Sequence, residues 1–454
     1  MKIDWQQFGL RTNPYDILPL VEGGDLSLED AFIGRAKERN FLDDIFESED
    51  RTCLTICGET GVGKTSLANV HKYVWKYKKK KLLFSCRREI EASDTLLNKQ
   101  SFLLEIIGSV LREIKLLQPE LLKEDLLLKL EQIVDISQMM TISGGLSANF
   151  SGFGGGINFS SDKKNSTPIK LSITSLEQHF LDLISFIKSN SIGGRIYRGL
   201  ILHVNNFDVV FSNPRHKNLV TIFFNEVRDL LQTKDVYFLF LGPTDFYSQV
   251  IAKEQRIKSV FGRTPLILKP LSKTEVVEAL EKRMNLLTSD GVKHYLKPID
   301  DEVVFRLYDL YEGDIRSVMT GIKDILGQYE ERLVQPLSTK EAMVLLAKER
   351  WASIEDELTK EQKKILEFLV TTNRNVSGKE ISDLLGKKQS NVSGYYFPPL
   401  KEMGIIEKKE KKGAMVYYGL TTQYHPLKWW FESEMGIRNA INAAQSSQPT
   451  LFGE

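Results

Sequence analysis

The segment Gly58-Glu59-Thr60-Gly61-Val62-Gly63-Lys64-Thr65 decides the fold of this chain. It matches the pattern G-x-x-x-x-G-K-[ST], follows an apolar run at 53–57 and leads into a helix-compatible stretch at 65–75. Strand, glycine-rich loop and helix in this order are the setting in which the pattern binds a nucleoside triphosphate. The glycines let backbone N–H groups surround phosphate oxygens, and the helix adds the positive end of its dipole.

The pattern predicts a role for each residue of this loop with ATP or ADP as ligand. Lys64 is expected to reach the β- and γ-phosphates, and Thr65 to bind Mg²⁺. The other candidates for contact with the nucleotide are Gly58, Glu59, Thr60, Gly61, Val62, Gly63 and Ser66.

Length and composition limit the class of protein. A chain of 454 residues is too long for one core, so about three domains are expected. The net charge of +1 excludes a globally basic nucleic-acid binder, although local basic patches are compatible with it. No apolar run is long enough to cross a bilayer, the first residues lack a signal-peptide core, and the three cysteines are expected to be reduced. A cytoplasmic protein without a membrane partner is therefore expected.

Apolar runs at 82–86, 200–204, 236–241 and 265–268 alternate with helical patterns. This alternation predicts an α/β core at 31–268, with a parallel sheet and helices on both faces. An irregular strap at 1–30 precedes the core, and an all-helical segment at 269–350 follows it. The five lysines within 75–81 are interpreted as a solvated helix end.

The segment 117–170 is interpreted as an insertion into the core. Its first half is leucine-rich and helical, and its second half is a glycine-rich stretch with alternating apolar residues. The alternation predicts a hairpin, while the glycine content disfavours a stable sheet. A mobile arm is favoured over a flexible linker.

In this order of elements the chain resembles the AAA+ ATPases, in particular the branch of replication initiators and origin-recognition proteins. Besides the loop, the resemblance depends on Asn205-Asn206-Phe207-Asp208, on Thr244 and on Gly313-Asp314-Ile315-Arg316. It implies that 269–350 is a helical lid. It also implies that Thr244 and Arg316 are polar sensors of the bound nucleotide.

Two departures from the family pattern bear on activity. The family carries Asp-Glu where this chain has Asn205-Asn206, and an amide cannot take a proton from water. Binding with slow or absent hydrolysis is therefore expected, unless a shifted strand register gives Asp208 the metal or base role. The family usually carries an arginine that contacts a neighbouring subunit, and this chain has Val260 at that position. In a homo-oligomer, Arg256 or Arg263 would have to take over that contact.

The segment 351–424 is expected to form a separate small α+β domain. Three helical patterns followed by a strand–turn–strand pattern resemble a winged helix-turn-helix. Residues 359–420 hold twelve Lys/Arg and seven Asp/Glu, a net charge of about +5. Duplex DNA is therefore the expected partner. The candidate contacts are Gln389, Ser390, Asn391 and Ser393 for bases, with Lys387, Lys388, Lys408, Lys409, Lys411 and Lys412 for phosphates.

The tail 425–454 is expected to be flexible, and Gln448, Leu451 and Phe452 resemble peptides that dock on polymerase sliding clamps. The favoured function is an ATP- or ADP-binding AAA+ switch that binds duplex DNA. One alternative is an active ATPase that remodels a replication or transposition complex. The other is a signalling or defence scaffold in which the winged helix contacts proteins.

Overall fold

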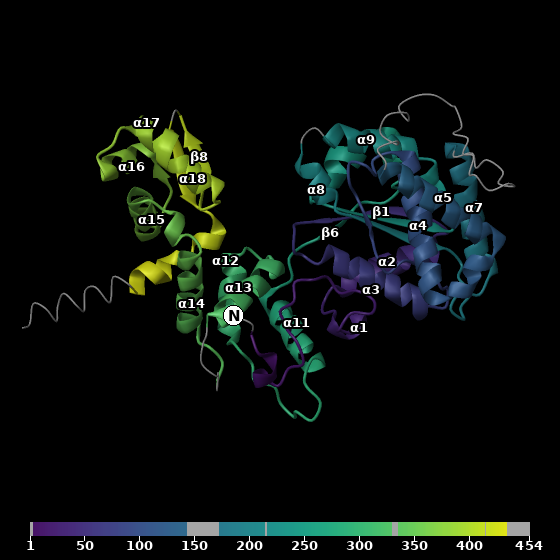
Figure 1. Ribbon diagram of the computed structural model, residues 1–454, viewed down its shortest axis with the longest axis horizontal. Coiled ribbons are helices and arrows are strands. Elements are labelled where there is room, and N and C mark those ends of the chain that lie inside the picture. The colour runs from purple at the N-terminus through teal and green to yellow at the C-terminus, as the bar shows by residue number, and fades with distance from the viewer. Residues whose placement is uncertain (1–2, 143–171, 214–215, 329–334, 414, 434–454) are drawn as a thin grey trace, which may run out of the picture. The chain divides into compact units, whose positions relative to one another are not determined.

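The computed structural model describes residues 3–142, 172–213, 216–328, 335–413 and 415–433. It divides the chain into Leu18–Pro270, here called the P-loop unit, and Met1–Ile17 with Leu271–Glu454, here called the C-terminal unit (Figure 1). None of the helices in the described ranges is both long and apolar enough to span a membrane. The predicted glycine-rich hairpin and the clamp-like peptide lie outside these ranges.

A parallel sheet forms the centre of the P-loop unit and confirms the predicted fold class. The strand order is β2-β4-β5-β1-β6, and β3 also pairs with β4. The strands are β1 (Thr52–Gly58), β2 (Phe84–Ser85), β3 (Ile90–Glu91), β4 (Leu200–Asn205), β5 (Val236–Gly242) and β6 (Leu266–Leu268). β1 has a hydrogen-bonded partner on each side, with Cys57 opposite Gly242 of β5 and Ile267 of β6.

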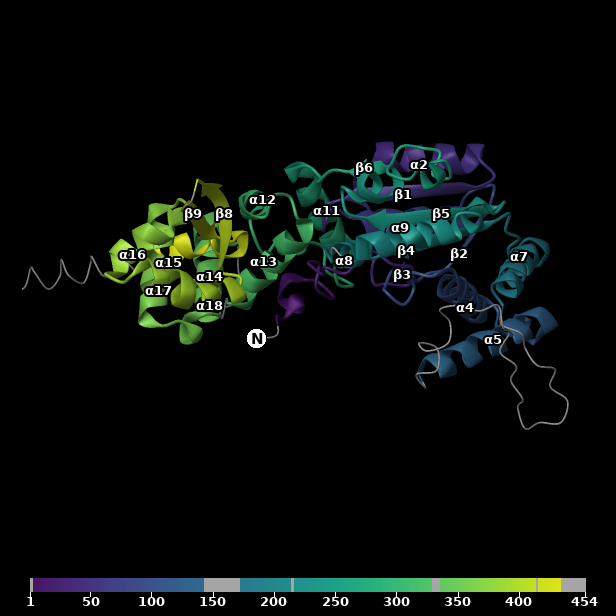
Figure 2. The same ribbon diagram turned by 90° about the horizontal axis from the view of Figure 1, so that it is seen from above.

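Helices cover both faces of this sheet (Figure 2). They are α1 (Leu28–Ala31), α2 (Ala36–Ser48), α3 (Lys64–Tyr77), α4 (Lys99–Leu117), α5 (Asp125–Ile142), α7 (Ile173–Ser189), α8 (Phe207–Ser212), α9 (His216–Val227) and α10 (Gln255–Lys258). Leu54 and Ile56 of β1 pack in a core with α2 and α3, whereas Cys53 and Cys57 pack in a core with α4, α5, α7 and α9. This alternation is the period-2 pattern of a strand with both faces buried.

The lysine-rich run at 75–81 is not uniformly solvated, contrary to the expectation. Lys76 is fully buried, with its Nζ 2.6 Å from Glu113 Oε1 and 3.3 Å from Glu22 Oε2. Lys79 pairs with Asp43 at 2.8 Å, and Lys80 is exposed. The local sequence could not reveal the difference, because Glu22 and Glu113 come from the N-terminal segment and from α4, both distant in sequence.

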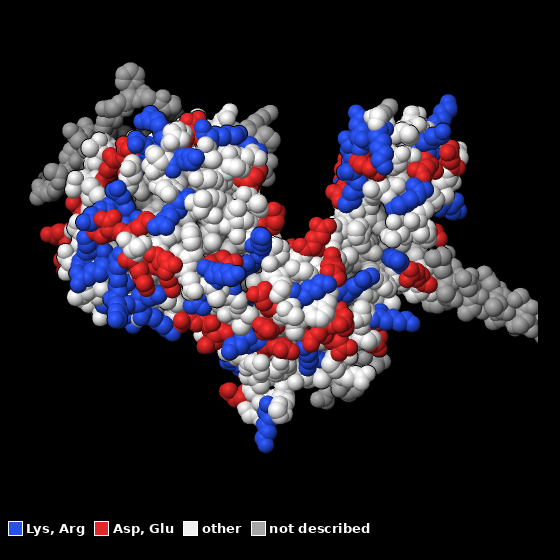
Figure 3. All heavy atoms as spheres, turned by 180° about the vertical axis from the view of Figure 1, so that it is seen from behind, with Lys and Arg blue, Asp and Glu red and all other residues white. Residues whose placement is uncertain are grey.

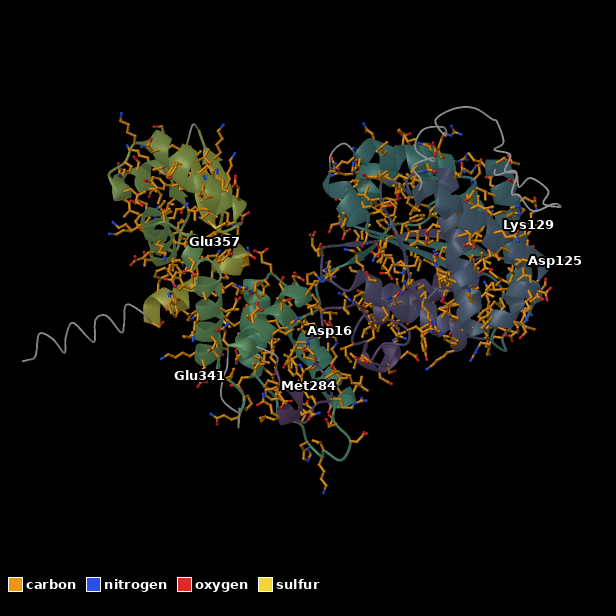
Figure 4. The ribbon with its side chains drawn as sticks, viewed as in Figure 1. Asp16, Asp125, Lys129, Met284, Glu341 and Glu357 are labelled. Carbon is orange, nitrogen blue, oxygen red and sulfur yellow. The ribbon has the colours of Figure 1, made fainter. Side chains whose placement is uncertain are left out.

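The N-terminal segment contributes to both units. Its first part belongs to the C-terminal unit, where Tyr15 is buried and the guanidinium of Arg283 donates to the carbonyl of Asp16 at 2.8 Å. Figure 4 labels Asp16 on this segment and Met284 on α11, beside Arg283. Its second part belongs to the P-loop unit, where the backbone N–H of Leu20 donates to Ser66 Oγ at 3.3 Å.

The C-terminal unit continues with helices and then a small α+β module. The helices are α11 (Lys273–Leu286), α12 (Asp301–Leu310), α13 (Ile315–Gly327) and α14 (Thr339–Ala352). The module consists of α15 (Lys360–Thr372), β7 (Val376–Ser377), α16 (Gly378–Leu385), α17 (Gln389–Asn391), α18 (Phe397–Glu402), β8 (Ile406–Lys412) and β9 (Met415–Leu420). Its antiparallel sheet has the order β7-β9-β8 and shares a core with α15 and α18.

The burial of Lys76 gives a stability prediction. Lys76→Ala should lower the free energy of unfolding by about 3 kcal/mol, because it leaves the Glu113 carboxylate buried without its closest cation. Lys80→Ala is the matched control and should change the free energy by less than about 0.5 kcal/mol, since Lys80 is exposed. Urea unfolding of both variants, followed by circular dichroism, measures the difference. Equal midpoints for the two variants would contradict the prediction.

Candidate functional site

The glycine-rich loop leaves the carboxyl end of β1 and ends at the first turn of α3. Gly61 and Gly63 adopt left-handed backbone angles, with φ of 82° and 91°. A Cβ on Gly58 would lie 2.7 Å from the carbonyl oxygen of Leu268, so only glycine fits beside β6. A Cβ on Gly63 would meet no atom within 4 Å, which leaves open space above the start of α3. These features give a concave backbone surface that can accept a phosphate.

Lys64 lies beneath this loop and is 7% exposed. Its Nζ donates to the carbonyl oxygens of Gly58 at 2.8 Å and Glu59 at 3.0 Å. The same atom lies 3.2 Å from Asp208 Oδ2. The other carboxylate oxygen, Asp208 Oδ1, is buried and has no hydrogen-bond partner within the described ranges. An ammonium beside a loop of backbone N–H groups fits an anionic ligand, which would compete with Asp208 for the charge of Lys64.

The predicted metal-binding position lies beside the end of β4. The side-chain amide of Asn205 donates to Thr65 Oγ1 at 3.1 Å. The Asn205 amide therefore bonds to the hydroxyl that is predicted to bind Mg²⁺. No group of three or more His, Cys, Asp or Glu side chains in the described ranges is arranged to hold a metal ion. A cation at Thr65 would therefore need phosphate oxygens and water as its remaining ligands.

Asn206 has a left-handed backbone conformation, with φ of 66° and ψ of 19°, and is the N-cap residue of α8. Asn tolerates this region better than other non-glycine residues, because its short polar side chain can bond locally. The conformation turns the chain sharply at the end of β4, so that Asp208 falls on the first turn of α8 beside Lys64. Sequence periodicity gave no sign of this turn.

Thr244 lies next to the loop, as expected for a residue that follows the neighbouring strand. Its hydroxyl donates to Glu59 Oε1 at 2.6 Å. β1, β4 and β5 are parallel, so their carboxyl ends share one edge of the sheet. That edge brings together Lys64, Asn205, Asp208 and Thr244.

Arg35 is a residue of this site that the sequence reasoning did not assign. It is buried, and its guanidinium donates to the carbonyl oxygen of Val62 at 2.9 Å and pairs with Glu38 at 3.2 Å. Its backbone is left-handed, with φ of 62°, at the start of α2. The only local signal was Gly34-Arg35 before a helical pattern. The contact ties the loop backbone at Val62 to the start of α2.

The remaining arginines have different surroundings. Arg316 is exposed on the first turn of α13 in the C-terminal unit, where Asp314 caps the helix, so its predicted contact with a nucleotide stays a prediction. Arg263 is held by Glu49 at 2.6 Å. Arg256 is exposed on α10 and has no carboxylate within 4 Å in the described ranges.

The residues predicted to contact DNA cluster in the α+β module. Exposed side chains lie in the turn before α17, on α17 and in the helical turn after it, namely Lys387, Lys388, Gln389, Ser390, Asn391 and Ser393. On β8, Lys409 pairs with Glu407 at 2.5 Å and Lys412 with Glu410 at 3.2 Å. Lys408 and Lys411 are exposed without such a partner in the described part of the chain. These four lysines of β8 are therefore not equivalent.

The fold and the loop define an α/β protein of the P-loop class. No protein-family model matches the chain, and no curated protein matches its sequence. Among solved structures, the chain is similar to the Aeropyrum pernix ORC1 protein in complex with DNA, at 14% identity and a TM-score of 0.46, over 95% of this chain and 99% of that one.

Two further structures are similar. The A. pernix ORC2 protein in its ADPNP-ADP complexes is 14% identical with a TM-score of 0.43, over 92% of this chain and 98% of that one. The Thermotoga maritima RuvB Holliday junction branch migration motor is 14% identical with a TM-score of 0.36, over 86% of this chain and 93% of that one. All three TM-scores are below 0.5, so no property of these proteins is carried over to the chain.

Proposed function

We propose that this chain is an AAA+-type switch that binds ATP or ADP with Mg²⁺ in the P-loop unit and duplex DNA through the C-terminal module. The observation that carries the nucleotide part is the buried Lys64 ammonium beneath a loop with two left-handed glycines. Thr65 would hold Mg²⁺ together with the phosphates, and the ion would neutralise phosphate charge. Bound nucleotide would displace Asp208 from Lys64 or share the lysine with it.

Slow or absent hydrolysis is the second part of the proposal. A general base must be able to accept a proton within hydrogen-bond reach of the attacking water. Asn205 is bonded to Thr65 and Asn206 has an amide side chain, so neither can accept that proton. The nucleotide would then act as a long-lived ligand that favours one conformation of the protein rather than as fuel for repeated cycles.

The alternative of an active ATPase is favoured by one observation, the Asp208 carboxylate. It is the only carboxylate that the described residues place within 4 Å of Lys64 Nζ, and its Oδ1 has no partner in the described ranges. If Asp208 acts as the base, the unmodified protein hydrolyses ATP readily and Asp208→Asn stops it. Arg256 is then the exposed arginine available to contact a neighbouring copy of the chain.

The DNA part of the proposal depends on the α+β module. The helices α15, α16, α17 and α18 and a three-stranded antiparallel sheet support the proposal of a winged helix. The segment at 389–393 would enter the major groove, and the turn between β8 and β9 would follow the backbone. The excess of about five positive charges over 359–420 supports an anionic partner.

The nucleotide part predicts that Lys64→Ala abolishes retention of ATP or ADP while the far-ultraviolet circular dichroism stays unchanged. The reason is that Lys64 supplies the buried positive charge of the loop. Lys78→Ala is the control, because Lys78 is the exposed C-cap residue at the other end of the same helix. Nucleotide released from denatured protein is measured by ion-exchange chromatography. Undiminished retention in the Lys64 variant would overturn the assignment of the loop.

The hydrolysis part predicts that Asn206→Glu raises phosphate release by up to about 10²-fold, because it supplies a base. Both Asn206→Glu and the control Asn206→Gln should lose about 1 kcal/mol of stability, since the left-handed backbone disfavours longer side chains. Only the glutamate should change turnover. A rise in both variants, or in neither, would show that the carboxylate at this position is not what limits hydrolysis.

The DNA part predicts different effects for the two kinds of wing lysine. Replacing Lys408 and Lys411 with Gln should lower the magnitude of the log–log salt slope of duplex binding by up to about 1.8, because two phosphate contacts are lost. Replacing Lys409 and Lys412 removes the same charge but should have a smaller effect, since Glu407 and Glu410 already neutralise them. Fluorescence anisotropy at several salt concentrations measures the slopes. Unchanged binding in both variants would favour the scaffold alternative.

A further inference from the structure

A group of cations lies at the amino-terminal edge of the sheet in the P-loop unit, at the opposite end of the strands from Lys64. It is formed by the segment that follows α3 and by the turn that precedes β4, and it consists of Lys80, Arg195 and Arg198, here called the basic edge. The backbone N–H of Arg198 donates to the carbonyl of Leu82 at 2.7 Å, which fixes one segment against the other. Figure 3 shows Lys and Arg side chains gathered at the lower left of this unit.

The basic edge differs from the lysines around it, because most of those lysines have carboxylate partners. The exception is Lys81, whose Nζ donates to the carbonyls of Phe46 and Glu49 and to Tyr237 Oη. Lys76 is bound to Glu113, Lys78 to Glu29, Lys79 to Asp43 and Glu47, and Lys188 to Asp235. By contrast, no carboxylate lies within 4 Å of the side-chain nitrogens of Lys80, Arg195 and Arg198 in the described part of the chain. All three side chains are exposed. Their positive charges are therefore available to an external anion.

Aromatic contacts hold one of these cations in place. The guanidinium carbon of Arg195 lies 4.8 Å from the centre of the Tyr77 ring, and Tyr77 is itself fixed by a 2.6 Å hydrogen bond to Glu22. A stacked guanidinium keeps its N–H edges free for a planar, bidentate acceptor, although one N–H donates to the carbonyl of Gly193 at 3.2 Å. Because the side chain is already ordered, little entropy is lost when it binds a phosphate.

We propose that the basic edge is a second DNA-contact surface, which binds the phosphate backbone of duplex DNA without reading its sequence. This step rests on the proposed function, because it takes DNA as the partner. A protein interface needs an apolar centre. On these two segments, as far as they are described, Ile196 is the one large apolar side chain that is exposed. Phosphate is therefore favoured over an acidic protein as the partner. The glycine-rich loop and the basic edge lie at opposite ends of α3. Because this helix has 14 residues, the two are about 20 Å apart.

The test compares full-length variants that lose the same charge. Lys80→Gln, Arg195→Gln and Arg198→Gln are combined in one protein, and Lys99→Gln, Lys115→Gln and Arg228→Gln, whose cations are paired with carboxylates, are combined in a control. Anisotropy with two unrelated duplexes gives affinity and salt slope. The basic-edge variant should lose affinity for both duplexes alike, with a slope smaller in magnitude by up to about 2.7. The control should keep both values, and all proteins should keep their melting temperature.

The variant with Gln at Lys408 and Lys411 separates this proposal from the function proposed for the winged helix. If the wing variant loses binding and the basic-edge variant does not, the basic edge is not a DNA surface and the proposed function stands. If only the basic-edge variant loses binding, the surface is confirmed and the assignment of the winged helix is wrong. If the unmodified chain binds neither duplex, or if the control loses as much as the basic-edge variant, the basic edge is overturned.

Discussion

The hydrogen-bonded pairing of β1 with β5 on one side and β6 on the other is the constraint on which the site depends. It fixes where β1 ends, and the loop can leave the sheet only there. Gly58 lies against the carbonyl of Leu268, so the last strand of the sheet shapes the first residue of the loop. The same parallel pairing brings the ends of β4 and β5 to the loop. Polar residues from three separate parts of the chain therefore lie together at one edge of the sheet.

The edge at Lys64 contains charges that balance one another within the protein. The ammonium of Lys64 is shared among two carbonyl oxygens and the Asp208 carboxylate, while Glu59 is bound by Thr244. A phosphate that enters this network competes with Asp208 for the lysine. Under the proposed function, a highly charged ligand would be favoured, because a weaker anion would not compensate for the lost Lys64–Asp208 ion pair.

Much of this arrangement could be predicted from the sequence. The glycine-lysine pattern gives the loop, and the alternation of apolar runs with helical patterns gives the parallel sheet. The structure places Thr244 beside the loop, because a residue that follows β5 lies at the same edge of the sheet, while its contact with a nucleotide stays a prediction. These features are encoded within a few consecutive residues, so local periodicity is enough to find them.

The features that the sequence did not reveal depend on long-range contacts or on single backbone angles. The burial of Lys76 requires Glu22 and Glu113, and the role of Arg35 requires the carbonyl of Val62. The ion pair of Lys64 with Asp208 requires the left-handed turn at Asn206. The periodicity of the sequence does not show which of several lysines pairs with a carboxylate 37 residues away. That pairing depends on which residues the fold brings together.

The left-handed backbone at Asn206 also bears on how a site of this kind could be re-engineered or could change over generations. A single codon can exchange the amide for a carboxyl group, but the main chain at that point accepts only a few side chains without strain. Side-chain chemistry and backbone shape are therefore coupled at this position, because a longer side chain adds backbone strain together with its new functional group. A substitution made there for its chemistry also changes stability.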